Sequence, residues 1–119
     1  MTGSAKRKGS RAELAAAQLI SDLTGHRVRR MLGEGRTDDV GDLAGVPDTT
    51  IQVADWADVA RAVWEKPIGA EQQRINAGVG YTATFVWLPR RGFRVALTPE
   101  QWAAYSAATL PCPRCGGGS

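Results

Sequence analysis

The chain contains few of the residues that bind zinc. Its 119 residues include one histidine, His26, and two cysteines, both within Cys112-Pro113-Arg114-Cys115. A zinc knuckle needs four ligands, so this pair supplies half of one. No second pair exists and His26 is distant in sequence. We therefore do not expect zinc at Cys112 and Cys115 within one molecule, although two chains could share an ion. We interpret residues 109–119 as a flexible tail.

Long apolar runs are also missing. No apolar run approaches the ~20 residues of a membrane span, and the basic first residues lead into an amphipathic segment instead of a signal peptide's apolar stretch. The apolar fraction of 43% and charged fraction of 23% are ordinary for a globular protein. A chain of 119 residues has room for one domain with a single modest core. We expect one intracellular domain, over residues 10–108, with no membrane partner.

Positive charge is concentrated at the start of the chain. The net charge is +3, but residues 1–36 hold eight Lys and Arg against three acids, while the remainder holds seven against nine. A basic segment of this kind suits phosphate binding. It is equally typical of a disordered basic start, which we expect over 1–9, followed by solvated helix faces. The candidate substrate-binding residues are Lys6, Arg7, Lys8, Arg11 and Arg36.

Periodicity and turn residues predict the order α-β-β-β-α-β-β-α. The first helix starts at Ser10, which forms a capping box with Glu13, and the final helix is capped by Thr98 with Pro99 at its first position. Between them we expect strands over 26–31, 40–44, 50–54, 81–88 and 93–97, a helix over 55–64 that is capped by Asp55 and ended by Pro67, and a second helical piece over 71–77. This order predicts an α/β fold with a mixed central sheet and helices on both sides.

The hairpin formed by 40–44 and 50–54 carries the most informative residues. Asp42 lies near the end of its first strand, and Gln52 and Ala54 share one face of its second strand because strand side chains alternate. A metal-dependent nuclease needs two oxygen ligands for Mg²⁺ and, two residues further on, a lysine that orients water. Ala54 stands at the lysine position. The pattern is that of a nuclease site with one part missing.

The segment GDLAGVPDTTIQVAD, residues 41–55, resembles the GDIxGVPxxxIEVKN signature of phage-encoded Holliday-junction resolvase-like proteins. These belong to the PD-(D/E)xK, or restriction-endonuclease-like, superfamily. The resemblance runs from about Arg7 to Trp102: it includes Glu13 in KGSRAEL, a QQRINAG segment similar to the family's ANAGAD, and FRVALTPEQW, similar to its YVVMTxEQF. It departs at Gln52, where the family usually has Glu, and at Ala54, where it has Lys.

The resemblance implies a restriction-endonuclease-like core and a catalytic Mg²⁺ or Mn²⁺ site. Glu13, Asp42 and Gln52 would be both metal ligands and catalytic residues, with DNA as substrate. Glutamine, which some superfamily members carry here, is a weaker ligand than a carboxylate. Loss of the lysine is more serious, since preorganised donors are commonly worth a factor of ~10²–10³. The basic residues that could replace it, although salt bridging is their ordinary role, are Arg61, Lys66 and Arg74.

Two functions stay open at this level. The first is a Holliday-junction resolvase-like DNA endonuclease fold with weakened or lost catalysis, acting in the host cytoplasm. The second is a catalytically inactive copy that serves as a structural or protein-interaction module of a phage assembly, located in the virion. Retained Glu13 and Asp42 favour the first function, whereas Gln52 and Ala54 favour the second.

The four tryptophans lie on apolar stripes, so core or dimer packing is their default role. Resolvase-like proteins act as dimers because a four-way junction has two symmetric strands to cut. Trp56 and Trp64 are the candidates for such an interface, and the predicted partners are DNA, a second copy of the chain, and phage proteins.

Overall fold

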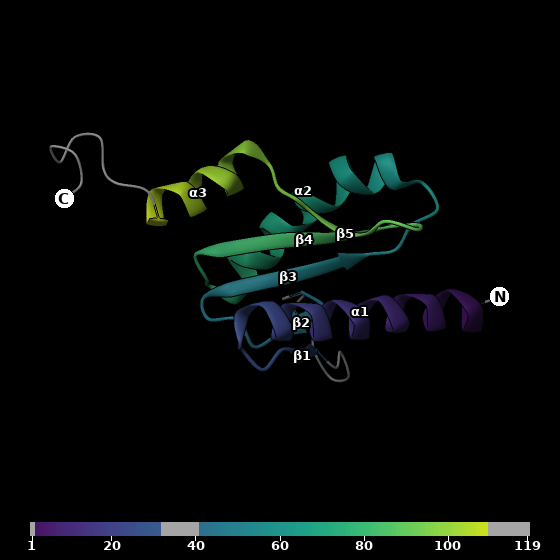
Figure 1. Ribbon diagram of the computed structural model, residues 1–119. Helices are drawn as coiled ribbons and strands as arrows, with labels where there is room; N and C mark the ends of the chain where they lie inside the picture. The colour runs from purple at the N-terminus through teal and green to yellow at the C-terminus, as the bar shows by residue number, and fades with distance from the viewer. Residues whose placement is uncertain (1, 32–40, 110–119) are drawn as a thin grey trace, which may run out of the picture.

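A computed structural model describes the backbone of residues 2–31 and 41–109, and the side chains from Ser10 onward within these ranges. The elements are α1 (Thr2–Thr24), β1 (Arg29–Arg30), β2 (Leu43–Ala44), β3 (Thr49–Ala54), α2 (Val59–Ala77), β4 (Tyr81–Leu88), β5 (Gly92–Ala96) and α3 (Pro99–Thr109). Their order is the predicted one (Figure 1). Within these ranges no helix is both long and apolar enough to cross a bilayer.

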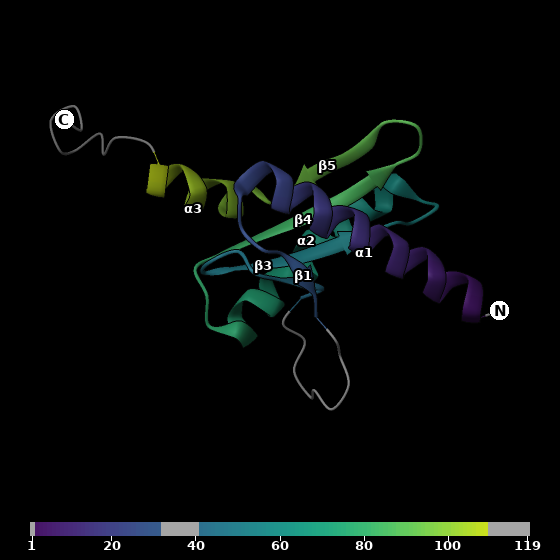
Figure 2. The same cartoon turned by 60° about the horizontal axis from the view of Figure 1, so that its bottom comes forward.

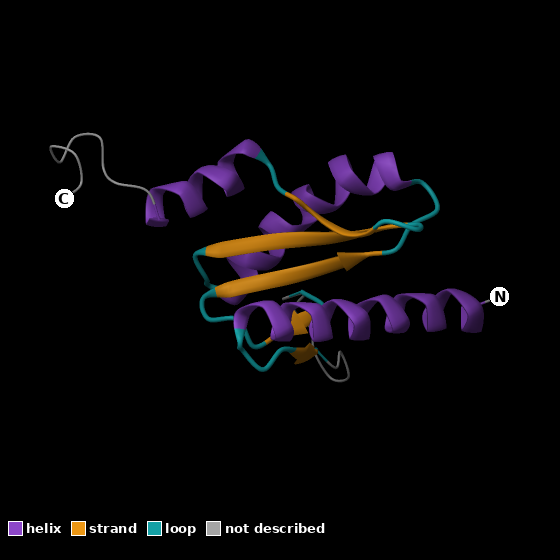
Figure 3. Ribbon diagram, in the orientation of Figure 1, coloured by secondary structure: helices purple, strands orange, loops and turns teal. Residues whose placement is uncertain are grey.

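The strands form one mixed sheet in the order β1-β2-β3-β4-β5. β3 and β4 pair in parallel, whereas the other neighbours are antiparallel. A parallel pair needs a crossover connection, and α2 provides it behind the sheet (Figure 3). The predicted α/β fold with a mixed central sheet is therefore confirmed.

Helices cover both faces of the sheet. α1 packs against Ile51 and Val53 through a stripe of small residues and Ile20, which lets the helix approach closely. On the opposite face, Ala54 and Val86 pack against Ala62 of α2. Figure 2 shows α1 crossing in front of β3 and β4, and Figure 1 shows α2 behind β4. The alternation of β3 side chains therefore decides which helix each residue meets.

Two helix starts differ from the sequence prediction. α1 begins at Thr2, so Ser10 and Glu13 lie inside it and the predicted capping box there is wrong. A capping box is instead present at α3, where Gln101 N donates to Thr98 Oγ1 and Thr98 N donates to Gln101 Oε1, both at 3.1 Å. The predicted cap at Thr98 is confirmed.

α2 is one continuous helix, contrary to the prediction that Pro67 ends it. It begins at Val59, and its N-cap is Asp58, whose Oδ1 accepts a hydrogen bond from Arg61 N at 3.0 Å, so the predicted cap at Asp55 is wrong. Pro67 is buried inside the helix, and its carbonyl accepts from Gln101 Nε2 at 2.9 Å. Tertiary packing here outweighs the roughly 3 kcal/mol cost of an internal proline. The helix ends at left-handed Gly78, as predicted.

The turn between β2 and β3 holds two sheet segments together. Gly45 has φ 126°, and a Cβ there would overlap the carbonyl oxygen of Arg27. Asp48, at φ 55°, accepts from Gly80 N at 3.0 Å through Oδ1 and from Tyr81 N at 3.1 Å through its carbonyl. The turn therefore ties the starts of the two parallel strands and lets the Arg27 backbone pass close by.

Gly45→Ala is expected to destabilise the protein by at least about 2 kcal/mol, because it adds a backbone clash to a strained φ. Gly25 is the matched control: it is also left-handed, at φ 78°, but a Cβ added there would meet no atom within 4 Å. Gly25→Ala should cost about 1 kcal/mol. Urea unfolding of both variants measures the difference, and equal losses would show that the Arg27 contact is not limiting.

Candidate functional site

The pair Gln52 and Ala54 lies on the face of β3 that α2 covers. Gln52 is 5% exposed and Ala54 is 1% exposed. Ala54 packs among Ala62 and Val86 in an apolar cluster, and Trp56 lies against this cluster. Gln52 is next to Thr84 in the parallel register. The strand face predicted to carry catalysis is therefore closed to solvent.

Gln52 has a buried amide oxygen with an unusual environment. Its Oε1, like Thr84 Oγ1 on the neighbouring strand, has no hydrogen-bond partner among the residues that the structure describes. An amide oxygen that coordinates a hard cation would likewise have no hydrogen-bond donor on the side facing the ion. A metal site at Gln52 would also require the other two predicted ligands, Glu13 and Asp42, to lie close to this oxygen.

Glu13 contributes to an ion pair at the sheet edge. Its Oε1 accepts from Arg30 Nε at 2.9 Å, and Arg30 Nη2 also donates to Ser10 Oγ at 3.1 Å. The Glu13 side chain is 22% exposed and that of Arg30 is 32% exposed. This cluster fastens β1 to α1, which covers the face opposite to the one that carries Gln52.

Asp42 is engaged with the backbone of β3. Its Oδ2 accepts from Val53 N at 2.8 Å, its own N–H donates to the Ile51 carbonyl, and its carbonyl accepts from Met31 N. The carboxylate thus takes the place of a strand partner for β3 just beyond the single registered β2–β3 pair, Leu43↔Ile51. Asp42 lies close to Gln52 in the fold, but Glu13 does not join them.

Among residues 2–31 and 41–109, no group of three or more His, Cys, Asp or Glu side chains is placed to hold a metal ion. Glu13, Asp42 and Gln52 do not converge in this structure, so a Mg²⁺ or Mn²⁺ ion held by all three has no support from geometry and stays a prediction. Arg36, Cys112, Cys115 and residues 110–119 of the predicted tail lie outside the described residues, as do the side chains of Lys6, Arg7 and Lys8, whereas Thr109 is the last residue of α3.

The basic residues considered as substitutes for the missing lysine have other contacts. Arg61 donates to Glu65 at 3.0 Å, and both Arg61 and Lys66 lie 5.5 Å from the centre of the Trp56 ring. Such cation–π contacts stabilise a partly exposed aromatic ring. Arg74 pairs with Glu71 at 2.6 Å. Arg61 and Arg74 therefore have the salt-bridging role that the sequence suggested as ordinary.

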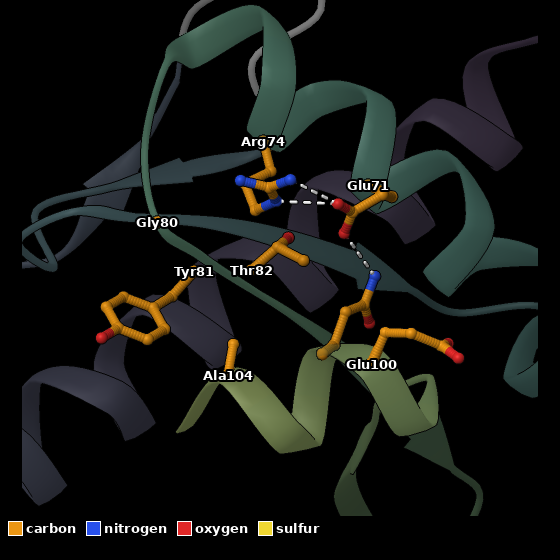
Figure 4. Close-up of a pocket in the computed structure, with 8 residues that line it drawn as sticks. Glu71, Arg74, Gly80, Tyr81, Thr82, Glu100 and Ala104 are labelled. Carbon is orange, nitrogen blue, oxygen red and sulfur yellow. Dashed lines mark hydrogen bonds and ion pairs between the residues drawn. The ribbon is translucent and has the colours of Figure 1, made fainter. Parts of the chain in front are cut away.

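A polar pocket of about 300 Å³ lies between α2, the start of β4 and α3 (Figure 4). Arg74 donates to Glu71 through Nε and Nη2 and to the Val79 carbonyl through Nη1, and Gln101 Nε2 reaches Glu71 Oε1 at 3.3 Å. The hydrogen bond from Arg74 is the main cause that lowers the pKa of Glu71, against the opposing effect of burial. These bonds join the end of α2 to α3, so the pocket is built around a structural network.

Tyr81, which lines this pocket, belongs to an aromatic pair. Tyr81 stacks on Tyr105 with ring centroids 5.1 Å apart, and Tyr105 Oη donates to the Thr82 carbonyl at 3.1 Å. Burial, followed by the neighbouring Tyr81, raises the pKa of Tyr105. Sequence reasoning did not find this pocket. The only available signal was Glu71 and Arg74 at helical spacing, which is common on exposed helix surfaces.

Glu71→Gln tests the network by its pH dependence. A carboxyl whose folded pKa lies below its ordinary value near 4.5 stabilises the fold above that value and loses the effect as pH falls through the folded pKa. The variant should therefore melt at a lower temperature than the unmodified protein at pH 7, and the two should converge in acid. Thermal unfolding across pH measures this. Glu65→Gln removes a carboxylate that accepts one hydrogen bond, from the exposed Arg61, so this variant should change little. A pH-independent gap for Glu71→Gln would contradict the ionic role.

No protein-family model, curated protein or solved structure matches the chain. Its function has to be inferred from the side chains themselves: a closed strand face at Gln52 and Ala54, and acids engaged in structural bonds at Glu13 and Asp42.

Proposed function

We propose that the chain is a DNA-binding protein on a resolvase-like nuclease fold that does not cleave DNA. The observation that carries this proposal is the burial of Gln52 and Ala54 under α2, at 5% and 1% exposure. Phosphodiester hydrolysis requires a phosphate, a metal ion and a water molecule to meet beside these two positions. A helix packed onto that face excludes all three.

The surroundings of Ala54 are also unsuited to the lysine that the nuclease motif has at this position. Its neighbours Ala62 and Val86 are each 0% exposed. An ammonium group placed there would have no water and no acidic partner in this apolar cluster, and burying an unpaired charge costs several kcal/mol. The packing of α2 is thus adapted to the small side chain, so catalysis and this arrangement of α2 are mutually exclusive.

The two retained acids have structural roles that account for their presence. Glu13 fastens β1 to α1 through Arg30, and Asp42 satisfies the Val53 amide where β2 no longer pairs with β3. Removing either would leave a buried or half-buried group without its partner. Their retention is therefore explained without a metal ion.

The fold is compatible with the resolvase-like assignment. The order of the elements and the mixed sheet between helices agree with the core that the resemblance implies. The hairpin signature lies where that resemblance puts it, with Asp42 beside β3. This agreement supports a nuclease ancestry for the fold and leaves the activity to be tested.

DNA binding is supported by exposed arginines on α1, on β1 and in the segment that joins them. Arg11, Arg27 and Arg29 are exposed, and none of them forms an ion pair with any residue in the described ranges. Val28 between Arg27 and Arg29 is buried, whereas both arginine side chains are exposed. Exposed guanidinium groups that form no ion pair are suited to phosphate contacts.

The proposal predicts binding to a labelled four-way junction with strong salt dependence and no cleavage in Mg²⁺ or Mn²⁺. Replacing Arg27 and Arg29 together by Gln should weaken junction and duplex binding alike. It should also lower the slope of log K against log salt by up to about 2, since each lost phosphate contact is worth ~0.9. Fluorescence anisotropy at several salt concentrations measures both effects.

Arg61→Gln is the matched control, because Arg61 is engaged on α2 by Glu65 and Trp56; it should leave binding unchanged. Metal-dependent nicking by the unmodified protein that is lost in Asp42→Ala would contradict the proposed lack of cleavage and would support the predicted metal site. Failure of the unmodified protein to bind any DNA would refute the function itself.

A second function, as a protein-interaction module, is favoured by one observation on α2. Trp64, Ile68 and Ile75 are 62%, 61% and 57% exposed. Their spacing places them on one stripe of the helix, opposite its buried face. Trp56, the other half of the predicted dimer interface, precedes α2 and lies half-buried under Arg61 and Lys66. The exposed stripe therefore differs from the one predicted.

If this stripe joins two copies, the protein should sediment as a dimer, and replacing Trp64 and Ile68 together by Glu should make it monomeric by placing charge in an apolar contact. Trp102→Glu on α3, where the side chain is 60% exposed, is the control and should not change the mass. Sedimentation of the unmodified chain as a monomer at high concentration would contradict this interface.

A further inference from the structure

A second cavity lies on the face of the sheet that α1 covers, away from the polar pocket of Figure 4. It has a volume of about 220 Å³ and is lined by Arg11, Ala12 and Ala15 of α1, by Asp55, and by Trp87 of β4. Asp55 directly follows β3 and continues its alternation, so it points away from the face of Ala54. The cavity therefore lies beside the arginine-bearing surface of α1.

Trp87 forms a rigid aromatic wall. Its ring meets that of Phe93, its cross-strand partner, edge to face, with centroids 5.1 Å apart and an interplanar angle of 70°. Phe93 is held in turn by Phe85 at 6.3 Å, also at 70°. Trp87 is only half-buried, and the chain turns at Pro89 directly after β4. A ring fixed on one side and open to a cavity is suited to stacking.

The charged residues of the cavity differ in what they can bind. Arg11 is exposed at the rim, where its guanidinium can reach a phosphate. Asp55 is half-buried and already engaged in an interaction, but a carboxylate has about four acceptor sites and can accept a further hydrogen bond from an amino group. A ligand that fits has a flat ring, an amino group on one edge and a phosphate attached at a distance. A nucleotide has all three.

The volume sets the size of the ligand. Pockets for whole small molecules span about 300–1,000 Å³, so a cavity of about 220 Å³ admits only part of a ligand. A single base fits this description, whereas paired bases in a duplex are stacked and unavailable. Branched and single-stranded DNA present unstacked bases.

We propose that the cavity formed by Arg11, Asp55 and Trp87 binds one unstacked base of the DNA held by the arginines of α1 and β1. The base stacks on Trp87, its amino group donates to Asp55, and Arg11 contacts the adjoining phosphate. This inference rests on the proposed DNA-binding function. It adds a preference for unpaired bases, and for bases with an exocyclic amino group, because the single N3–H donor of thymine is flanked by two carbonyl oxygens that a carboxylate repels.

The test compares binding of labelled oligonucleotides of about 12 nucleotides, a length suited to one single-strand site: oligo(dC), oligo(dT) and a duplex. Trp87→Leu should weaken oligo(dC) binding roughly 5- to 100-fold, the range for loss of one stacked base, and leave duplex binding unchanged. Asp55→Asn should reduce the preference of oligo(dC) over oligo(dT). Trp102→Leu, at an exposed tryptophan on α3, should change nothing.

A second variant tests the cavity without altering its aromatic wall. Ala15 is exposed on α1 and lines the cavity, and leucine is a good helix former, so Ala15→Leu fills the space and preserves the helix. It should weaken oligo(dC) binding as Trp87→Leu does. Ala103→Leu, at an exposed alanine of α3, is the matched control. Circular dichroism would check that each variant is folded.

The outcomes separate this inference from the proposed function. Equal oligo(dC) affinity in the unmodified protein, Trp87→Leu and Ala15→Leu, with duplex and junction still bound, would overturn the base site and leave DNA binding intact. Loss of duplex and oligo(dC) binding together in folded Trp87→Leu would also overturn it, because a stacking site acts only on unpaired bases. Absence of all DNA binding by the unmodified protein would remove both.

Discussion

The parallel pairing of β3 with β4 is the constraint on which the rest of the structure depends. Six residue pairs, from Thr49↔Tyr81 to Ala54↔Val86, are in register, and Asp48 holds the two strand starts together through Gly80 and Tyr81. Parallel neighbours cannot be joined by a tight turn, so the chain must cross the sheet between them. α2 makes that crossing. Its position then determines which side of β3 is closed.

The closure of this face explains its unusual polarity. Thr50 donates to Thr82 Oγ1 at 2.8 Å, but Gln52 Oε1 and Thr84 Oγ1 find no partner within the described residues. A buried polar atom without a partner costs about 1–3 kcal/mol, so an interior selected only for stability would have apolar side chains here. The face therefore carries polar residue types that are typical of a solvated site, but it is buried like a hydrophobic core. The proposed function accounts for this combination, because a nuclease fold that lost catalysis would retain polar residues on a face that is now an interior.

The opposite face combines tight packing with exposed charge. Alanines such as Ala12 and Ala16 let α1 lie close on the sheet, which keeps the core thin. Because the buried stripe of α1 is narrow, Arg11 remains outside it and the pair of Arg30 with Glu13 has room at the sheet edge. The two faces therefore have separate roles in the proposed function. We propose that the α1 side contacts DNA, whereas the α2 side holds the fold together and presents an exposed apolar stripe.

Local signals in the sequence determined the order of elements, the α/β class and several boundaries. The strand over 81–88, the helix end at Gly78 and the cap at Thr98 were all predictable, because apolar runs, a left-handed glycine and a Thr-Pro pair act on neighbouring residues alone. Only the tertiary structure decided that α2 continues through Pro67 and covers Ala54, and that Glu13 and Gln52 lie apart. All three outcomes depend on contacts between residues that are distant in the chain: a helix that continues through a proline, the burial of a strand face, and the relative positions of side chains from different elements. Sequence spacing carries no information about those contacts.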